Sequence, residues 1–371
     1  MQQQLIQKYL EGSATEEERL EVELWYASVQ VPYHQEQHND AVQSRIYAKT
    51  RESIGMATPI RKLRWFNPAI LSAAAAILLI TGAVFVVFNN GKQMERNAIL
   101  TNDIAPGGDQ AVLTLADGRH ISLDTATDGK LAGLQISKKK GLIIYTPSNI
   151  NASPGRYNTL ATPKGAKYEL ILPDGSHVWL NALSSIRYPE AFSTSQRSVE
   201  VQGEAYFEVA HQKTSDGKSR VPFVVYAGDE QIEVLGTHFN VHYYKGDPMQ
   251  LTTLLEGAVK VSSHGKSVSL LPGEAAGTEN NAQQIQKFTS VNTGLAVAWK
   301  NGEFQFEEAS VPEILNQVAR WYDVEVIYQG DIPQEHFSGK VSREENLTQV
   351  LEILKRGGIR FKINERKIIV Y

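Results

Sequence analysis

Two ten-residue stretches of the sequence share a pattern whose side chains could do chemistry. "LPDGSHVWLN" (residues 172–181) and "LADGRHISLD" (residues 115–124) each place an Asp, a Gly and a His within four positions. An imidazole close to a carboxylate can belong to a metal site or act as an oriented general base. The pattern therefore leaves two alternatives, a chemical site or a device of folding.

The same residues also meet the backbone requirements of a tight hairpin. In each copy the Asp suits the second central position of a type I turn, and the Gly suits the left-handed conformation that follows it. The strand after each turn alternates, so the His lies on the face opposite the aliphatic side chains, toward solvent. A catalytic His needs a shielded partner, so we interpret both copies as one structural unit used twice. The predicted turn residues are Asp117, Gly118, Asp174 and Gly175.

The remaining candidates for catalysis or metal binding are weaker. His238 and His242 are four positions apart, which on one strand separates them by about 13 Å, too far to share a metal ion. Glu204 and Glu208 could form a glycosidase pair, but no pattern places them in a cleft. The sequence contains no cysteine. We therefore predict no catalytic, cofactor or metal site, and a protein that is not an enzyme.

Hydropathy predicts one membrane span. Residues 68–88, "PAILSAAAAILLITGAVFVVF", contain no charged side chain and are long enough to form a helix of roughly 32 Å, which matches the hydrocarbon core of a bilayer. The predicted transmembrane helix covers residues 66–90, and a juxtamembrane linker covers 91–103. Basic residues crowd its N-terminal flank, which places the N-terminus in the cytoplasm. The net charge of −4 argues against direct binding of nucleic acid.

The segment before the predicted span, residues 1–64, is expected to form a small all-α cytoplasmic domain. A capping box begins at Thr15, in "TEEE", and apolar residues recur at helical spacing on both sides of it. So few apolar residues make a marginal core, which a partner would complete. The apolar residues in question are Leu5, Tyr9, Leu10, Leu20, Leu24 and Trp25.

The segment after the predicted span divides into two further domains. Residues 104–290 carry short alternating apolar runs separated by Gly, Pro, Asn and Asp, which predicts an all-β domain, either a sandwich or solenoid-like. Residues 300–371 repeat a strand, helix, strand pattern and predict an α+β domain of βαβ type. The predicted helix starts are the capping boxes Ser310 with Glu313 and Ser342 with Glu345.

Several of these phrases together resemble one protein family. "QKYLEGSATEEE", "TPKGAKYELILPDGSHVWLNALSSIRYP", "GEAYFEV", "LGTHFNV" and "LLEGAVKV" followed by "LPGEAA" occur in this order. The sequence is similar to the FecR family of transmembrane anti-sigma factors over nearly its whole length. The tail resembles the short N-terminal domain of secretins and TonB-dependent receptors.

The resemblance implies a function and a set of partners. A TonB-dependent outer-membrane receptor would present its signalling domain to this protein in the periplasm, and the protein would in turn control an ECF-type sigma factor in the cytoplasm. For some members it also implies cleavage by an intramembrane protease. The implied location is the bacterial inner membrane, crossed once, with the C-terminus in the periplasm and no cofactor. The predicted sigma-factor contacts are Leu5, Tyr9, Leu10, Leu20, Leu24 and Trp25.

Two functions of other classes stay open at this point. One is a membrane-tethered periplasmic carbohydrate-binding or assembly protein, which would bind its ligand through exposed aromatic side chains such as Trp179. The other is a tethered periplasmic hydrolase. Neither needs a folded helical domain inside the cell, so the N-terminal segment distinguishes them from an anti-sigma factor.

Overall fold

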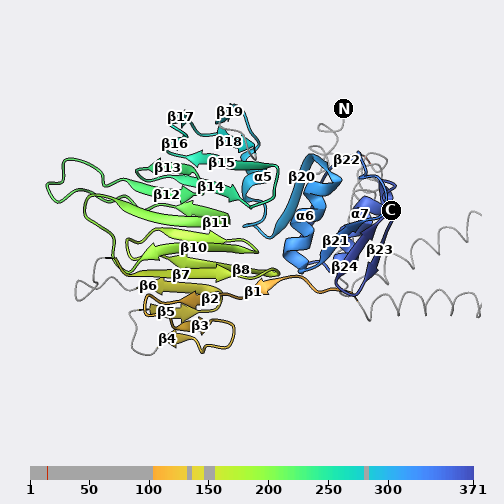
Figure 1. Cartoon of the computed structure of the whole chain (residues 1–371), viewed down its shortest axis with the longest axis horizontal. Coiled ribbons are helices and arrows are strands. Elements are labelled where there is room, and N and C mark those ends of the chain that lie inside the picture. The colour runs from red at the N-terminus through yellow and green to blue at the C-terminus, as the bar shows by residue number, and fades with distance from the viewer. Residues whose placement is uncertain (1–14, 16–102, 132–135, 146–154, 280–283) are drawn as a thin grey trace, which may run out of the picture. The chain divides into compact units, whose positions relative to one another are not determined.

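The computed structural model describes Thr15 and residues 103–371, except for 132–135, 146–154 and 280–283. These residues form a β region, followed by a smaller C-terminal domain of helices and strands (Figure 1).

The β region contains two sheets that share one long strand, β11. The first sheet has the order β3 (His120–Ser122), β2 (Val112–Thr114), β7 (Tyr157–Thr162), β10 (Ser184–Pro189), β11 (Arg197–Glu208), β12 (Phe223–Ala227), β13 (Glu230–Val234), β16 (Val259–Ser263) and β17 (Lys266–Leu270). The second has the order β4 (Gly129–Lys130), β5 (Ile136–Lys139), β6 (Leu142–Tyr145), β8 (Ala166–Ile171), β9 (His177–Leu180), β11, β14 (His238–Tyr243), β15 (Met249–Glu256), β18 (Ala275–Glu279) and β19 (Gln286–Phe288). The short β1 (Gly108–Asp109) pairs in parallel with β8.

Strand β11 changes sheets at Gly203. Residues before Gly203 pair with β10 and β12, and residues from Gly203 onward pair with β9 and β14. Gly203 has φ +85°, and a Cβ at this position would lie 2.4 Å from Ser184 Oγ. Only glycine avoids both the left-handed penalty and this clash, so this one residue sets where the strand passes from one sheet to the other.

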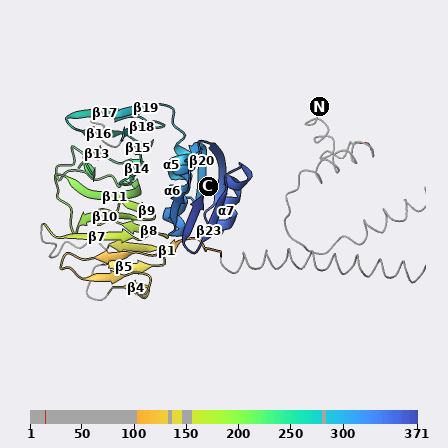
Figure 2. The same ribbon diagram turned by 45° about the vertical axis from the view of Figure 1, so that its right-hand side comes forward.

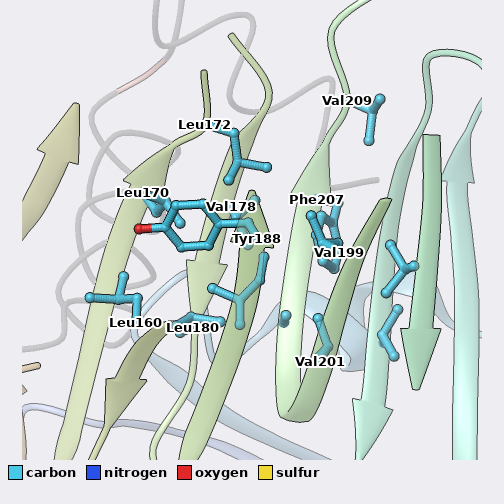
Figure 3. Close-up of a cluster of buried hydrophobic side chains, with 14 of the residues drawn as sticks. Leu160, Leu170, Leu172, Val178, Leu180, Tyr188, Val199, Val201, Phe207 and Val209 are labelled. Carbon is cyan, nitrogen blue, oxygen red and sulfur yellow. The ribbon is translucent and has the colours of Figure 1, made fainter. Parts of the chain in front are cut away.

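The core of the β region lies between the two sheets. Burial alternates along β7 and β8, so a shift of one residue would expose every apolar side chain of a strand. Leu160 of β7 and Tyr188 of β10 come from the first sheet, whereas Leu170 of β8 and Val178 of β9 come from the second, and all four belong to one buried cluster (Figure 3).

The C-terminal domain pairs its strands differently from the βαβ expectation. Its elements are α5 (Thr293–Val297), β20 (Glu303–Ser310), α6 (Val311–Tyr322), β21 (Glu325–Tyr328), β22 (His336–Ser342), α7 (Leu347–Arg356), β23 (Phe361–Asn364) and β24 (Lys367–Val370). The strands that precede α6 and α7, β20 and β22, pair with each other, and β21 pairs with β24, which in turn pairs with β23. Each helix therefore joins two separate small sheets instead of parallel neighbours in one sheet.

Helices α6 and α7 both begin at capping boxes, but only the first is the box that the sequence predicts. Ser310 and Glu313 form the expected capping box of α6. The expected box of α7 is wrong, because Ser342 is still part of β22, where it pairs with Glu303. Helix α7 starts at Leu347, and the side chain of Gln349 accepts a hydrogen bond from the backbone N–H of Asn346. Ser342 therefore pairs within the sheet instead of capping the helix.

The expected fold class also needs correction. In the part of the chain that the structure describes, strands predominate, and no helix is long and apolar enough to cross a membrane. Its longest helix, α6, has 12 residues, or about 18 Å, whereas a span needs about 20 residues. The described protein is thus mainly β, with a C-terminal domain of mixed structure. Apart from Thr15, the predicted helical domain 1–64, the span 66–90 and the linker residues 91–102 lie outside the described residues.

Candidate functional site at the junction of the two domains

The two Asp-Gly turns have closely similar backbones. Gly118 has φ +86° and Gly175 has φ +85°. In the first copy the N–H of Gly118 donates to the carbonyl of Leu115 at 2.9 Å, and in the second the N–H of Gly175 donates to Leu172 at 2.9 Å. The repeated Asp and Gly therefore serve the same purpose in both places, which is to close a hairpin.

The two turn carboxylates nevertheless lie in different environments. Asp174, whose side chain is 5% exposed, accepts a hydrogen bond of 2.7 Å from the guanidinium of Arg197, which is 2% exposed. Arg197 also donates to the carbonyl of Val221 and to one further carbonyl. Asp117 makes an ion pair of 2.7 Å with Arg119, and both side chains are exposed. The second turn is thus anchored to the core by a buried ion pair that the first turn lacks.

The histidines of the two turns differ as well. His120 is exposed and its Nδ1 lies 2.9 Å from Thr114 Oγ1. His177 is only partly exposed, because its ring stacks on Trp179 with centroids 3.6 Å apart. The ammonium of Lys300 lies 4.2 Å from the centre of the Trp179 ring. His177 and Lys300 thus cover part of the Trp179 ring, which is only partly exposed.

A cluster of charged and amide side chains joins the β region to the C-terminal domain, and we call it the junction. The β region contributes Asn181, Glu204, Asn240, His242 and Asp247, and the C-terminal domain with its preceding segment contributes Trp299, Arg320 and Arg343. Helix α6, which carries Arg320, lies beside the β region (Figure 1 and Figure 2).

The pairing of β11 with β14 positions the centre of the junction. In this register Glu204 stands directly opposite His242, so their side chains share one face of the sheet. His242 Nδ1 lies 3.3 Å from Glu204 Oε1, and its Nε2 lies 2.9 Å from Asp247 Oδ2. The other oxygen of Asp247 accepts from Arg320 Nη1 at 2.9 Å. A chain of alternating charges thus runs from β11 to helix α6.

The geometry of His242 suits a bridge rather than a metal site. Its two ring nitrogens face different carboxylates on opposite sides of the ring, whereas a chelating cluster needs its donors to converge on one point. Among the described residues no group of His, Asp and Glu side chains has the arrangement of a metal site.

The charges of the junction stabilise one another. Burial alone would lower the pKa of His242, but the nearby carboxylates of Glu204 and Asp247 outweigh this effect and raise that pKa to about 9. Burial would raise the pKa of both carboxyl groups, but the interactions with His242, and for Asp247 also with Arg320, hold the two pKa values below their usual range. At neutral pH His242 is therefore a cation between two carboxylates.

Amide side chains extend the junction to a second cation of the C-terminal domain. Asn181 donates to Glu204 Oε2 at 2.7 Å and accepts from Arg343 Nη2 at 3.0 Å. The indole N–H of Trp299 donates to Asn240 at 3.2 Å. Burial lowers the pKa of Arg343 to about 10, opposed by the charges of Tyr244 and Glu204. The links that cross directly are thus Arg320 with Asp247, Arg343 with Asn181 and Trp299 with Asn240. The other polar links of the junction lie within the β region and connect these crossing points.

The sequence had singled out some of these residues, but for other reasons. In the sequence Glu204 belongs to a candidate glycosidase pair and His242 to a candidate metal pair, and the structure brings these two residues together. Their former partners lie elsewhere, because Glu208 contacts Lys300 at 3.6 Å and His238 contacts Glu256 at 3.2 Å. Asp247, Arg320 and Arg343 were missed, since only the docking of the two domains makes their pairing visible. The six predicted sigma-factor contacts in the N-terminal segment lie outside the described residues.

The fold and the junction define a class of protein. The described chain consists of a β region and a small C-terminal domain, with separate cores, held together by buried charges that can separate only at a cost. Such an arrangement fixes the relative orientation of the two domains.

Comparison with known proteins identifies the family. Residues 158–260 match the family described as FecR protein, and residues 303–370 match the family described as FecR, C-terminal. A crystal structure at 1.65 Å of a protein from Parabacteroides distasonis ATCC 8503, named there as a candidate anti-sigma factor, is 28% identical, with a TM-score of 0.52 over 57% of this chain and 98% of that chain. A second crystal structure with the same name, at 2.50 Å, gives 28% identity and a TM-score of 0.52 over 58% of this chain and 98% of that one. No curated protein matches the chain.

The chain belongs to the FecR family of anti-sigma factors, as its sequence had indicated. Proteins of this family are regulators rather than enzymes.

Proposed function

We propose that this protein relays a signal from a TonB-dependent outer-membrane receptor to an ECF-type sigma factor. The observation that carries the proposal is that the two FecR matches, residues 158–260 and 303–370, fall on the two domains that the junction joins. In this proposal the receptor's signalling domain engages the C-terminal domain. The junction then passes the change to the β region, and the N-terminal segment holds or releases the sigma factor.

The proposal includes a location and an additional partner. The protein lies in the bacterial inner membrane, with its N-terminus in the cytoplasm and its C-terminus in the periplasm. An intramembrane protease takes part in releasing the sigma factor. The basic residues before the uncharged run 68–88 support this orientation by the positive-inside rule.

Sigma-factor binding is tested by co-purification. Full-length protein with an N-terminal tag, co-expressed with a candidate ECF-type sigma factor, is expected to retain that sigma factor, even after protease added outside spheroplasts has removed residues 104–371. Replacing Leu24 and Trp25 together by Asp is expected to abolish retention, because two charges would enter the apolar stripe that the partner covers. Replacing Glu16 and Glu17 by Gln on the same segment serves as the control. Retention by the Asp variant, or complete digestion of the tagged segment, would count against the proposal.

Transmission through the junction is tested separately. Asp247→Ala removes the carboxylate that joins His242 to Arg320, and it is expected to reduce the response of a target-gene reporter to receptor ligand by about tenfold or more while sigma-factor retention persists. Asp331→Ala, an exposed change in the same protein, should respond normally. A full response from Asp247→Ala, at normal protein level, would show that the junction does not carry the signal.

A further inference from the structure

A second feature of the molecule adjoins the junction and shares six of the eight junction residues with it. It is a cavity of about 530 Å³, bounded by β14 and β15 on one side, α5 on another, and β20 with α6 on a third. This volume falls within the range of about 300–1,000 Å³ that is typical of ligand sites. We call it the lateral cavity.

The lateral cavity has an apolar interior. Side chains that line it come from both domains and from the segment between them, and include Met249, Leu251, Phe288, Val291, Leu295 and Phe306. Transfer of an aliphatic side chain from water into such a lining is favourable in proportion to the apolar surface that it buries. The interior thus suits the aliphatic part of a ligand.

Carboxylates dominate the charge of the lateral cavity. Of its lining residues, Glu303, Glu307, Glu308 and Glu313 all lie on β20 or at the start of α6. Glu303 is paired with Lys340 at 2.6 Å. In the described part of the chain, the other three carboxylates accept hydrogen bonds from neutral groups, namely Asn292, Ser338 and Ser310.

The cations that line the cavity do not neutralise this charge. They are His242 and Arg320, and both already face Asp247 or Glu204 within the junction. The surplus negative charge therefore stays with Glu307, Glu308 and Glu313. An anionic ligand or a nucleic-acid backbone would be repelled here, whereas a cation would be attracted.

We propose that the lateral cavity binds an extended segment of a partner protein in which an aliphatic residue stands next to a Lys or Arg. The aliphatic side chain enters the apolar interior, and the cation meets Glu307 and Glu308, which are exposed at the rim. Because Asp247 and Arg320 line the same cavity, the bound segment touches the junction directly. This inference goes beyond the proposed relay and does not depend on sigma-factor binding.

A designed peptide tests the proposal on the purified full-length protein. The probe is a fluorescein-labelled hexapeptide of alternating Lys and Val, and the comparison peptide alternates Glu and Val. Fluorescence anisotropy is expected to show binding of the Lys peptide alone, and raising the salt from about 0.05 to about 0.5 M should weaken it by about tenfold, since rim charges are screened.

Three variants locate the binding. Glu307→Lys is expected to weaken binding by about tenfold or more through charge reversal, and Leu295→Trp by a similar factor through filling the interior. Glu335→Lys, an exposed charge reversal outside the lining, should bind as the unchanged protein does. Equal binding by all three variants, or equal binding of the Glu peptide, would overturn the proposal. The proposal would also fail if the Lys peptide did not bind and the protein instead associated with itself in a way that Glu307→Lys abolished. The occupant of the cavity would then be a second copy of this chain.

Discussion

Replacing Asp174 by Ala is expected to destabilise the β region by about 3–5 kcal/mol, because it leaves Arg197 as an unpaired charge in the core. The same replacement of Asp117 is expected to cost less than about 1 kcal/mol, since its ion pair with Arg119 is exposed. Both changes remove the Asp of an Asp-Gly turn, so the stability lost within the turn itself should be similar in the two variants. Urea unfolding of the full-length protein, followed by tryptophan fluorescence, measures the difference.

The double replacement Asp174→Ala with Arg197→Met identifies the cause. If the buried charge is responsible, removing both partners should recover most of the loss, because an apolar pair of similar volume does not need a counter-charge. If the double variant is no more stable than Asp174→Ala, the loss comes from the turn. Equal costs at Asp117 and Asp174 would lead to the same conclusion.

These two turns show how far the sequence predicts the structure. The residue types Asp and Gly determine the turn, since a left-handed position and a side chain that bonds its own backbone are local requirements. The contrast between a buried and an exposed carboxylate is not local. The contrast depends on Arg197, the first residue of β11, which belongs to neither hairpin. No spacing in the sequence relates Arg197 to either turn.

The junction follows the same logic at larger scale. His242 and Glu204 were visible as titratable residues on predicted strands, but their meeting depends on the pairing of β11 with β14 after the change of sheet at Gly203. Arg320 lies on a helix whose capping box was predicted correctly, yet a cap says nothing of what the later polar positions of the helix contact. The docking of the two domains decides which residues Arg320 contacts, and no periodic pattern in the sequence predicts this docking.

The stability of the junction is expected to decrease as the pH rises above about 6.5. His242 has a pKa of about 9 in the folded protein against 6.5 for an ordinary histidine, so the folded protein binds this proton more tightly than the unfolded chain does. Its contribution is fully present below about pH 6.5 and is lost as the pH rises through 9. Each pKa unit corresponds to about 1.4 kcal/mol, so the full loss is up to about 3.5 kcal/mol. Thermal unfolding of the full-length protein at a series of pH values measures it.

On the acid side the contribution of the carboxylates has the opposite sign. The pKa values of Glu204 and Asp247 are lowered in the folded protein, so their contribution is present above the unfolded values and is lost as the pH falls through the folded ones. Between about pH 5 and pH 6.5 all three charges are in place, and the junction is expected to be most stable there.

Glu204→Gln separates this mechanism from general effects of pH. The Gln keeps the shape of the side chain but removes the charge that does most to raise the pKa of His242, so the pKa of His242 is expected to fall. The variant should be less stable than the unchanged protein by about 2–3 kcal/mol near pH 6.5, and this gap should narrow as the pH rises through 9. His238→Gln is the control, because His238 lies on the same strand as His242 but in an exposed pair with Glu256. This variant should follow the pH profile of the unchanged protein. If the gap between Glu204→Gln and the unchanged protein is constant from pH 6.5 to 9.5, His242 is not the group that couples the junction to pH.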